Sequence, residues 1–178
     1  ATAPSNGQFA AIDVMSNRTC CQTRIYGASA SDLDEDGYLD LTTVNEVSGD
    51  VRVFLNKGDG TGLYDSFLSP QDIGDEASPN EPADFNNDGH ADLCVAATSS
   101  HSIWILLGAG DGTFSSITEI PTGNDPHGIT TLDVDGDGDL DVVNANRGTN
   151  NLARFLNNGS GVFGAASFFE GGVNAEYG

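Results

Sequence analysis

The stretch Asp32-Leu-Asp-Glu-Asp-Gly-Tyr-Leu-Asp40 decides the fold, because the chain repeats its pattern twice more. The second copy is Asp84-Phe-Asn-Asn-Asp-Gly-His-Ala-Asp92, and the third is Asp133-Val-Asp-Gly-Asp-Gly-Asp-Leu-Asp141. The starts of the three copies are 52 and 49 residues apart. Self-similarity at a nearly constant period is typical of repeat architectures, in which each repeat is one supersecondary unit.

A glycine-rich turn keeps step with this acidic loop. Gly58-Asp-Gly-Thr61, Gly110-Asp-Gly-Thr113 and Gly159-Ser-Gly-Val162 each begin 26 residues after the first Asp of their loop. All the variation in length therefore falls between a glycine turn and the next acidic loop. This distribution indicates a folded module with one tolerant surface connection.

Short apolar runs, rich in β-branched and aromatic residues, separate the two motifs. The runs 51–55, 103–107 and 152–156 share one register and are bounded by Gly, Asn, Asp and Ser, which is the signature of strands. A further run follows the glycine turn, as at 114–120, and a short one precedes the acidic loop, as at 128–132. Each unit therefore reads as four antiparallel strands in about 50 residues, which is one propeller blade.

The sequence thus predicts an all-β fold, a β-propeller-type array of three four-stranded antiparallel blades that belongs to a larger or oligomeric assembly. A lone four-stranded sheet cannot bury both faces, so the blades must stack on one another. The chain 1–178 is expected to form a single array. Its parts are an outer strand of a preceding blade with a cysteine-containing loop at 1–24, blade 1 at 25–68, blade 2 at 69–120, blade 3 at 121–169, and the lead-in to a next blade at 170–178.

The acidic loop has the composition of a Ca²⁺ site. This hard cation takes about six to eight oxygen ligands, which Asp side chains at positions 1, 3, 5 and 9 and a backbone carbonyl at position 7 supply, while Gly at position 6 allows the sharp turn. Asn86 at position 3 of the second loop keeps an oxygen but loses a charge, so its site is expected to be the weakest. The predicted ligands of three Ca²⁺ ions are Asp32, Asp34, Asp36, Tyr38, Asp40, Asp84, Asn86, Asp88, His90, Asp92, Asp133, Asp135, Asp137, Asp139 and Asp141.

Two other interpretations of the loop fit less well. Asp and Gly also gather in plain turns, but turn chemistry does not require the same five positions in three copies. An EF-hand needs Glu at position 12 and flanking helices. Position 12 is Thr43, Val95 and Asn144 here, and the flanking segments are strand-like.

On these motifs the units resemble FG-GAP/VCBS repeats, the blades of integrin-α-like and of bacterial or fungal extracellular β-propellers. The elements that carry the resemblance are Asp-x-Asp/Asn-x-Asp-Gly-x-x-Asp and Leu106-Leu-Gly-Ala-Gly-Asp-Gly-Thr-Phe114, and it spans nearly the whole chain. The resemblance implies Ca²⁺ in the loop that joins a blade's first two strands, a secreted or cell-surface location, and binding or adhesion more often than catalysis. A longer insertion at 15–26 and Ser160 in place of the usual Asp depart from the pattern, but neither is a ligand position.

The charge of the chain restricts its partners. The formal net charge is −21, with 27 acidic and 6 basic residues, and thirteen of the acids lie in the three acidic loops. This balance argues against nucleic acid and against membrane insertion or anionic membrane surfaces, which attract clustered Lys and Arg. A hydrophobic content of 38% argues against disorder, since disordered acidic chains lack it.

No catalytic constellation is visible. His90, His101 and His127 lie in different repeats without a shared motif, serines lack a nucleophile-elbow context, and aspartate pairs fall within the acidic loops. The expected function is therefore non-catalytic: an extracellular calcium-binding module for recognition or adhesion, lectin-like or protein-binding. The alternatives are a self-assembly module whose blades associate between chains into a ring or filament, and an accessory propeller of a secreted enzyme.

A ligand surface is predicted opposite the acidic loops, where the second-to-third and fourth-to-first connections of four-stranded blades lie. Half of the six basic residues fall there, namely Arg18, Arg24 and Arg147, together with His101. Cationic donors on one face of an acidic body favour an acidic or hydroxyl-rich ligand, such as a glycan or a protein. Scattered loop charges are the alternative interpretation.

The ends of the chain read as parts of further blades. Ser5-Asn-Gly-Gln-Phe9 matches the glycine-turn element, and 170–178 resembles the lead-in 121–128. The expectation is that the chain is not a closed monomer, because propellers close with about four to eight blades. Either it is a segment of a longer array, or copies join end to end as a ring or an open filament.

The cysteines and sequons leave several possibilities open. Cys94 lies in an apolar run and is predicted to act as a small buried hydrophobe. The adjacent Cys20 and Cys21 are compatible with a vicinal disulfide, a bond outside the chain, or two ordinary thiols. Asn17 and Asn158 begin sequons that permit glycosylation in a secreted protein.

Overall fold

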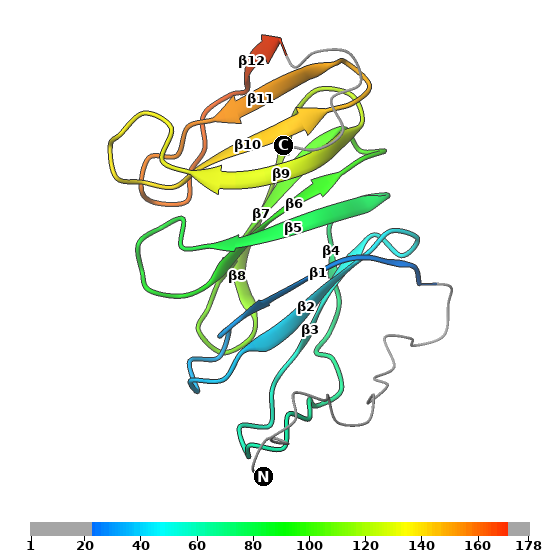
Figure 1. Ribbon diagram of the computed structural model, residues 1–178, viewed down its shortest axis with the longest axis vertical. Coiled ribbons are helices and arrows are strands. Elements are labelled where there is room, and N and C mark those ends of the chain that lie inside the picture. The colour runs from blue at the N-terminus through cyan, green and yellow to red at the C-terminus, as the bar shows by residue number, and fades with distance from the viewer. Residues whose placement is uncertain (1–22, 171–178) are drawn as a thin grey trace, which may run out of the picture.

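The computed structural model describes residues 23–170, and all regular secondary structure in that range is β-strand (Figure 1). Three sheets of four strands follow one another along the chain, and every pairing of neighbouring strands is antiparallel. The strands are β1 (Ile25–Ser31), β2 (Asp40–Asn45), β3 (Asp50–Phe54) and β4 (Gln71–Asp72) in the first sheet, β5 (Ala77–Ala83), β6 (Asp92–Ala97), β7 (Ser102–Gly108) and β8 (Phe114–Pro121) in the second, and β9 (Pro126–Leu132), β10 (Asp141–Asn146), β11 (Asn151–Phe155) and β12 (Ser167–Glu170) in the third. The predicted all-β class with three antiparallel blades is confirmed. The part of the chain that the structure describes holds no helix of the kind that crosses a membrane.

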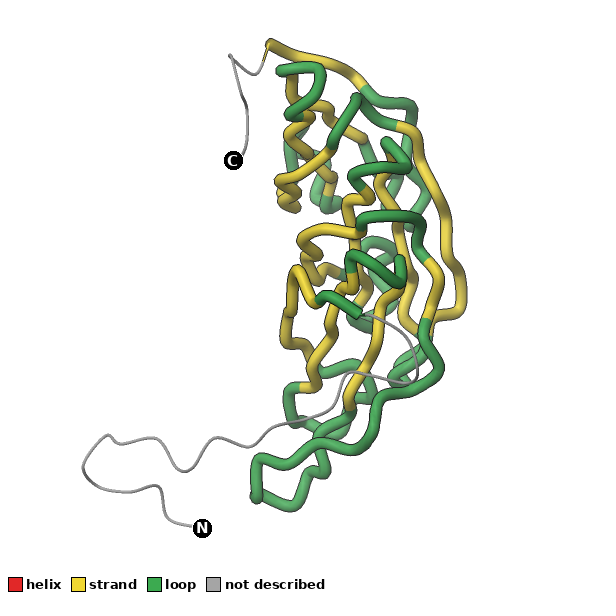
Figure 2. The backbone as a smooth tube through the Cα atoms, turned by 90° about the vertical axis from the view of Figure 1, so that its right-hand side faces the viewer, coloured by secondary structure: helices red, strands yellow, loops and turns green. Residues whose placement is uncertain are grey.

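The three sheets stack face to face in a curved arc (Figure 2). In each sheet the strands follow chain order, so the first strand is one edge and the fourth strand is the other. The first strands β1, β5 and β9 pack against one another and form the inner side of the array. This arrangement places the start and the end of the three inner strands at two opposite edges of the stack.

Two apolar cores lie between the sheets. Val44 and Val51 of the first sheet pack against Leu93, Val95 and Leu106 of the second, and all five are completely buried. Successive residues of a strand point to opposite faces, so the neighbours in β6 and β7 turn to the third sheet instead. Burying side chains of this size stabilises the fold by about 1.5–3 kcal/mol each, and only stacking of the sheets buries them.

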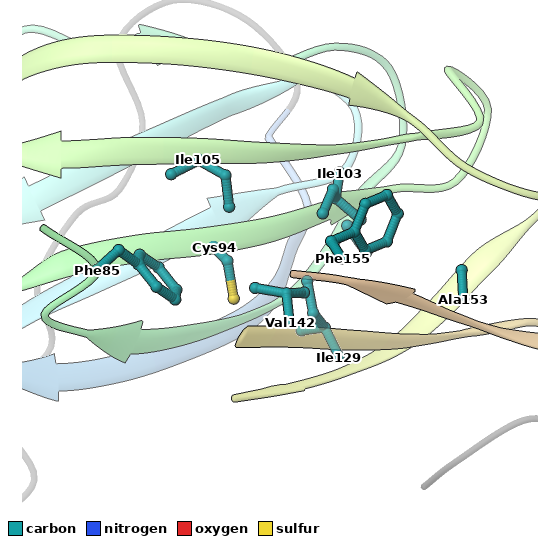
Figure 3. Packing of buried hydrophobic residues seen from close by; sticks show 9 residues of the cluster. Phe85, Cys94, Ile103, Ile105, Ile129, Val142, Ala153 and Phe155 are labelled. Atoms are coloured by element: carbon teal, nitrogen blue, oxygen red, sulfur yellow. The ribbon is translucent and has the colours of Figure 1, made fainter. Parts of the chain in front are cut away.

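The second core contains the only cysteine among residues 23–170. Cys94 packs with Phe85 and Ile105 of the second sheet and with Val142 and Phe155 of the third (Figure 3). Its thiol is unpaired and fully buried, and this burial strongly raises its pKa. Cys94 therefore behaves as a small hydrophobe, as predicted, whereas Cys20 and Cys21 lie outside the described residues.

The first sheet differs from the others at its outer edge. Its fourth strand, β4, has two residues and follows a long connection that holds one isolated bridge, Asn56 with Tyr64. Strand β4 pairs with β3 although it lies beyond residue 68, so the first sheet uses residues that the sequence analysis assigned to the second blade. The connection already bonds to β3 before this strand, since the N–H of Leu68 donates to the carbonyl of Val53 at 2.9 Å, but Pro70 lacks the N–H that a regular ladder requires.

Candidate metal centre

The three acidic loops join the first and second strands of the sheets, β1 to β2, β5 to β6 and β9 to β10. All three therefore leave the stack at the same edge, which is the left-hand edge in Figure 1. We call this the acidic edge. The predicted ligand positions are thus repeated three times along one side of the molecule, at the ends of the strands that form its inner side.

The first Asp of each loop fastens the sharp turn. Its Oδ2 accepts a hydrogen bond from the backbone N–H of the glycine at position 6, at 3.0–3.1 Å in the three loops. Each of these glycines has a positive φ, a conformation that residues with a Cβ rarely adopt. The glycines are Gly37 (φ 87°), Gly89 (φ 91°) and Gly138 (φ 98°).

The side chains at positions 3 and 5 are held by the same backbone contacts in all three loops. An oxygen at position 3 accepts the N–H of position 5 at 3.2–3.3 Å, and a carboxylate oxygen at position 5 accepts the N–H of position 7 at 2.8–3.0 Å. These contacts curl the three loops in the same way. The three loops therefore share one hydrogen-bonded scaffold around a set of oxygens.

Position 9 has a second task that the sequence analysis did not foresee. Asp40, Asp92 and Asp141 are completely buried, and each accepts two backbone N–H groups. One N–H comes from position 2 of the same loop, and the other from the last residue of the third strand or from two residues beyond it, at 2.7–2.9 Å. A carboxylate has about four lone-pair sites, so these bonds leave acceptor capacity for a cation.

Within the first loop, and separately within the third, the carboxylate oxygens lie close enough together to bind one ion per loop. One carboxylate oxygen from each of Asp32, Asp34 and Asp36 lies within 4.8 Å of the others, and Asp133, Asp135 and Asp141 form a similar group. Oδ1 of Asp32 is buried without a hydrogen-bond partner. An unsatisfied buried carboxylate oxygen is costly, and a bound cation removes that cost. The residues present therefore fit a Ca²⁺ ion bound through oxygen ligands.

The environment of these carboxylates also favours a cation. Burial raises the pKa of Asp34, and the negative charge of Asp40 raises it further. Burial likewise raises the pKa of Asp92, and the charges of Asp88 and Asp84 add to the effect, while the N–H groups of Phe85 and Gly108 oppose it. Groups whose charged form is disfavoured by burial and by like charges gain from a bound divalent ion.

The second loop differs from its neighbours in one contact. Asn86 donates a hydrogen bond from Nδ2 to Oδ2 of Asp88 at 2.7 Å, and its Oδ1 accepts the N–H of Asp88 at 3.2 Å. The hydrogen bond from the N–H of His90 is the main cause of a lowered pKa of Asp88. Asn86 thus replaces the repulsion between the carboxylates at positions 3 and 5, which the other loops retain, by a hydrogen bond. The second loop therefore offers a cation one negative charge less.

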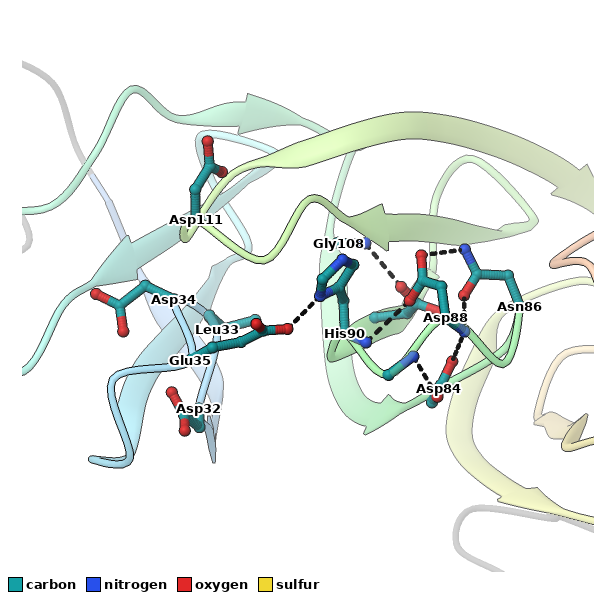
Figure 4. A network of polar contacts seen from close by, with 12 residues as sticks. Asp32, Leu33, Asp34, Glu35, Asp84, Asn86, Asp88, His90, Gly108 and Asp111 are labelled. Atoms are coloured by element: carbon teal, nitrogen blue, oxygen red, sulfur yellow. Dashed lines mark hydrogen bonds and ion pairs between the residues drawn. The ribbon is translucent and has the colours of Figure 1, made fainter.

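Neighbouring acidic loops also touch each other. His90 of the second loop forms an ion pair with Glu35 of the first (Figure 4). Asn87 of the second loop donates to Oδ1 of Asp139 in the third at 3.0 Å. The hydrogen bond to Glu35 raises the pKa of His90. Position 4 of one loop therefore contacts position 7 of the next, which joins the predicted sites across both seams between sheets.

The glycine turns complete these seams. The N–H of Gly112 donates to the carbonyl of Leu33 at 2.8 Å, and the N–H of Gly161 donates to the carbonyl of Phe85 at 3.0 Å. Leu33 and Phe85 occupy position 2 of the first and second acidic loops. Each of these two loops is thus held by the glycine turn of the following sheet, which explains why the two motifs keep step in the sequence.

The predicted ligand surface lies at the opposite edge, but its arginines are paired with acids. Arg24 forms an ion pair with Glu46, which raises the pKa of the Arg24 guanidinium, and Nε of Arg147 lies 2.8 Å from Oδ2 of Asp125. His101 Nδ1 lies 3.0 Å from the carbonyl of Thr98. Arg18 lies outside the described residues.

Comparisons with known proteins agree with this architecture. The family model described as FG-GAP-like repeat matches residues 32–95 and 84–144. Among solved structures, an Agrocybe aegerita lectin described as recognising non-reducing terminal N-acetylglucosamine is 21% identical, with a TM-score of 0.53, over 79% of this chain and 37% of the lectin chain. A Photorhabdus luminescens Tc holotoxin pore structure is 19% identical, with a TM-score of 0.44, over 80% of this chain and 7% of that chain. This chain therefore spans well under half of either chain, and no curated protein sequence matches it.

Proposed function

Because the chain belongs to the FG-GAP-like repeat family, we propose that it is a calcium-binding, non-catalytic recognition module that works outside the cell. Its ligand is a carbohydrate or a protein, and three Ca²⁺ ions, one per acidic loop, hold the blades in their stacked arrangement. The ions' chemistry is to neutralise converging carboxylates and to fix the loop conformation. The neighbouring lectin supports the recognition role by fold alone.

The observation that carries this proposal is the repeated oxygen scaffold. Three loops place nearly the same side chains on the same backbone donors, with Asn86 the one exception, although the residues at positions 2, 4, 7 and 8 differ between them. In the first loop this scaffold leaves a buried carboxylate oxygen of Asp32 without a donor. A plain turn gains nothing from such a set of acids, whereas a divalent cation requires it.

The test is a calorimetric titration of the chelator-treated chain with CaCl₂. We expect three sites in the unaltered chain and the loss of one site in Asp36→Asn and in Asp137→Asn. Asp111→Asn is the matched control, because it also removes one carboxylate but lies in a glycine turn, where the uncharged Ser160 occupies the same position in the third repeat. Absence of binding heat in the unaltered chain contradicts the proposal, as does an equal loss of sites in the control.

Self-association through the third sheet is the second candidate function. The faces of β10 and β11 that point away from the second sheet carry Val143 and Leu152, and β12 exposes Phe168 by 53% and Phe169 by 47%. Exposed apolar surface of this kind marks interaction sites. Phe169 pairs with Leu152 and so lies on the same outward face. Light scattering separates the two candidates, because a module that works by self-association forms concentration-dependent oligomers that Phe169→Ser weakens.

A further inference from the structure

The edge opposite the acidic loops holds a polar cavity to which all three sheets contribute. Its volume is about 200 Å³. The cavity lies where the inner strands begin and where the second strands turn into the third strands, and we call it the axial pocket. It is lined by Tyr26, Glu46, Glu76, Thr98, His127 and Arg147.

The lining residues occupy equivalent places in successive repeats. Glu46, Thr98 and Arg147 are 52 and 49 residues apart, which is the spacing of the acidic loops. Each donates its backbone N–H, at 2.8–3.0 Å, to the residue that precedes the inner strand of its sheet. Those acceptors, Arg24, Glu76 and Asp125, follow the same spacing. The repeat therefore builds the frame of the pocket, while the side chains in that frame differ from sheet to sheet.

Two of the three charged side chains of the pocket are paired with an opposite charge within the protein. Glu46 is paired with Arg24, and Arg147 is paired with Asp125. Glu76 accepts a hydrogen bond from Ser99 Oγ. A phosphate or sulfate group requires cationic donors in excess, and this pocket does not have them. Carboxylate lone pairs and guanidinium N–H groups nevertheless offer hydrogen bonds to a neutral ligand with many hydroxyl groups.

Tyr26 gives the pocket an aromatic wall. Its side chain is held from behind by His127, with the hydroxyl 3.0 Å from Nε2 and the ring centroids 5.5 Å apart. His127 is 9% exposed, whereas Tyr26 is 42% exposed, so the tyrosine ring is braced and still open to solvent. The face of an aromatic ring carries partial negative charge, which attracts the weakly positive C–H groups of a sugar ring.

From this combination we propose that the axial pocket binds one pyranose residue of a glycan. The C–H face of the sugar lies on Tyr26, and its hydroxyl groups hydrogen-bond with Glu46, Glu76 and Arg147. The cavity of about 200 Å³ is smaller than the pockets of about 300–1,000 Å³ that hold larger ligands, which favours one sugar unit over an oligosaccharide. This site deepens the recognition function proposed above and rests on it.

The test is an NMR titration of the calcium-saturated chain with the methyl glycosides of glucose, galactose, mannose and N-acetylglucosamine. We expect one of them to bind with a Kd below about 10 mM and Tyr26→Ala to weaken that binding at least about tenfold. Tyr26→Phe keeps the ring and is expected to bind within about threefold of the unaltered chain. Phe168→Ala is the matched control, because it removes an exposed aromatic ring from β12, outside the pocket.

The calcium stoichiometry of each variant, measured in parallel, shows whether it is folded. Absence of binding of all four glycosides to the unaltered chain overturns the proposal, as does a Tyr26→Ala variant that is folded and binds as well as the unaltered chain. Binding of inorganic sulfate more tightly than any glycoside also overturns it. If no glycoside binds but the chain binds calcium, the assignment of the pocket is wrong and the calcium-binding module stands. If the calcium titration fails as well, the recognition module itself is wrong.

Discussion

The two edges of the stacked sheets are built from the same repeat but by opposite rules. At the acidic edge, three loops carry nearly the same side chains on the same backbone donors. At the axial pocket, the backbone bonds repeat while the side chains change, from Arg24 to Glu76 to Asp125 at one place and from Glu46 to Thr98 to Arg147 at the other. The acidic edge therefore offers every blade the same chemistry, whereas the side chains of the axial edge are free to form one specific site.

Removal of calcium is expected to have the largest effect on this contrast. A ligand present at about 100 times its Kd stabilises the native state by about 2.7 kcal/mol per site, which corresponds to roughly 5–10 °C in Tm for a chain of this length. Differential scanning calorimetry with excess chelator and with excess CaCl₂ measures the shift. An unchanged Tm would show that the acidic edge is a set of plain turns.

The substitution Asp141→Asn separates the two tasks of position 9. An amide cannot accept both backbone N–H groups that now bond to Asp141, so one buried donor loses its partner at a cost of about 1–3 kcal/mol. We expect lower stability to urea even in chelator. Asp137→Asn, at the exposed position 5, serves as the control, since its effect is expected only with calcium present.

The substitution Asn86→Asp makes the second loop resemble the other two. It replaces the hydrogen bond between Nδ2 of Asn86 and Asp88 by a repulsion between carboxylates, and it offers the cation one more charge. We expect the affinity of the weakest site to rise about tenfold, equivalent to about 1.4 kcal/mol, while stability in chelator falls slightly. Competition titration with a fluorescent chelator measures the calcium affinity of the weakest site in the unaltered chain and in the variant. An unchanged affinity contradicts the prediction that the second loop holds the weakest site.

The substitution Asp125→Asn is expected to have the smallest effect. Asn tolerates the positive φ of 56° at this position, and the ion pair with Arg147 is half exposed, so its loss costs less than about 1 kcal/mol. Calcium affinity is expected to stay unchanged, because the substituted residue lies at the opposite edge. A clear loss of calcium affinity would show that the two edges are coupled.

The acidic edge could be predicted in detail because the oxygen scaffold requires particular residues at particular spacings, and the sequence shows them three times. The axial pocket could not be predicted, since residues such as Tyr26 and His127 occupy equivalent positions of the repeat but have different types of side chain. Their spacing in the sequence was nevertheless a usable signal, because Tyr26, Ser78 and His127 are separated by the same 52 and 49 residues as the acidic loops. The short strand β4 was missed for a different reason, because the connection before it bonds to β3 only irregularly, with Phe67 packed on Phe54 and Arg52.

The bonds from Gly112 to Leu33 and from Gly161 to Phe85 have a consequence for how the molecule is made. A loop of one sheet is closed by an amide that belongs to the next sheet and is synthesised about 80 residues later. During translation the first and second loops therefore remain incomplete until the following sheet has emerged and docked. We expect calcium to be captured in the order of synthesis, always one sheet behind the growing end of the chain.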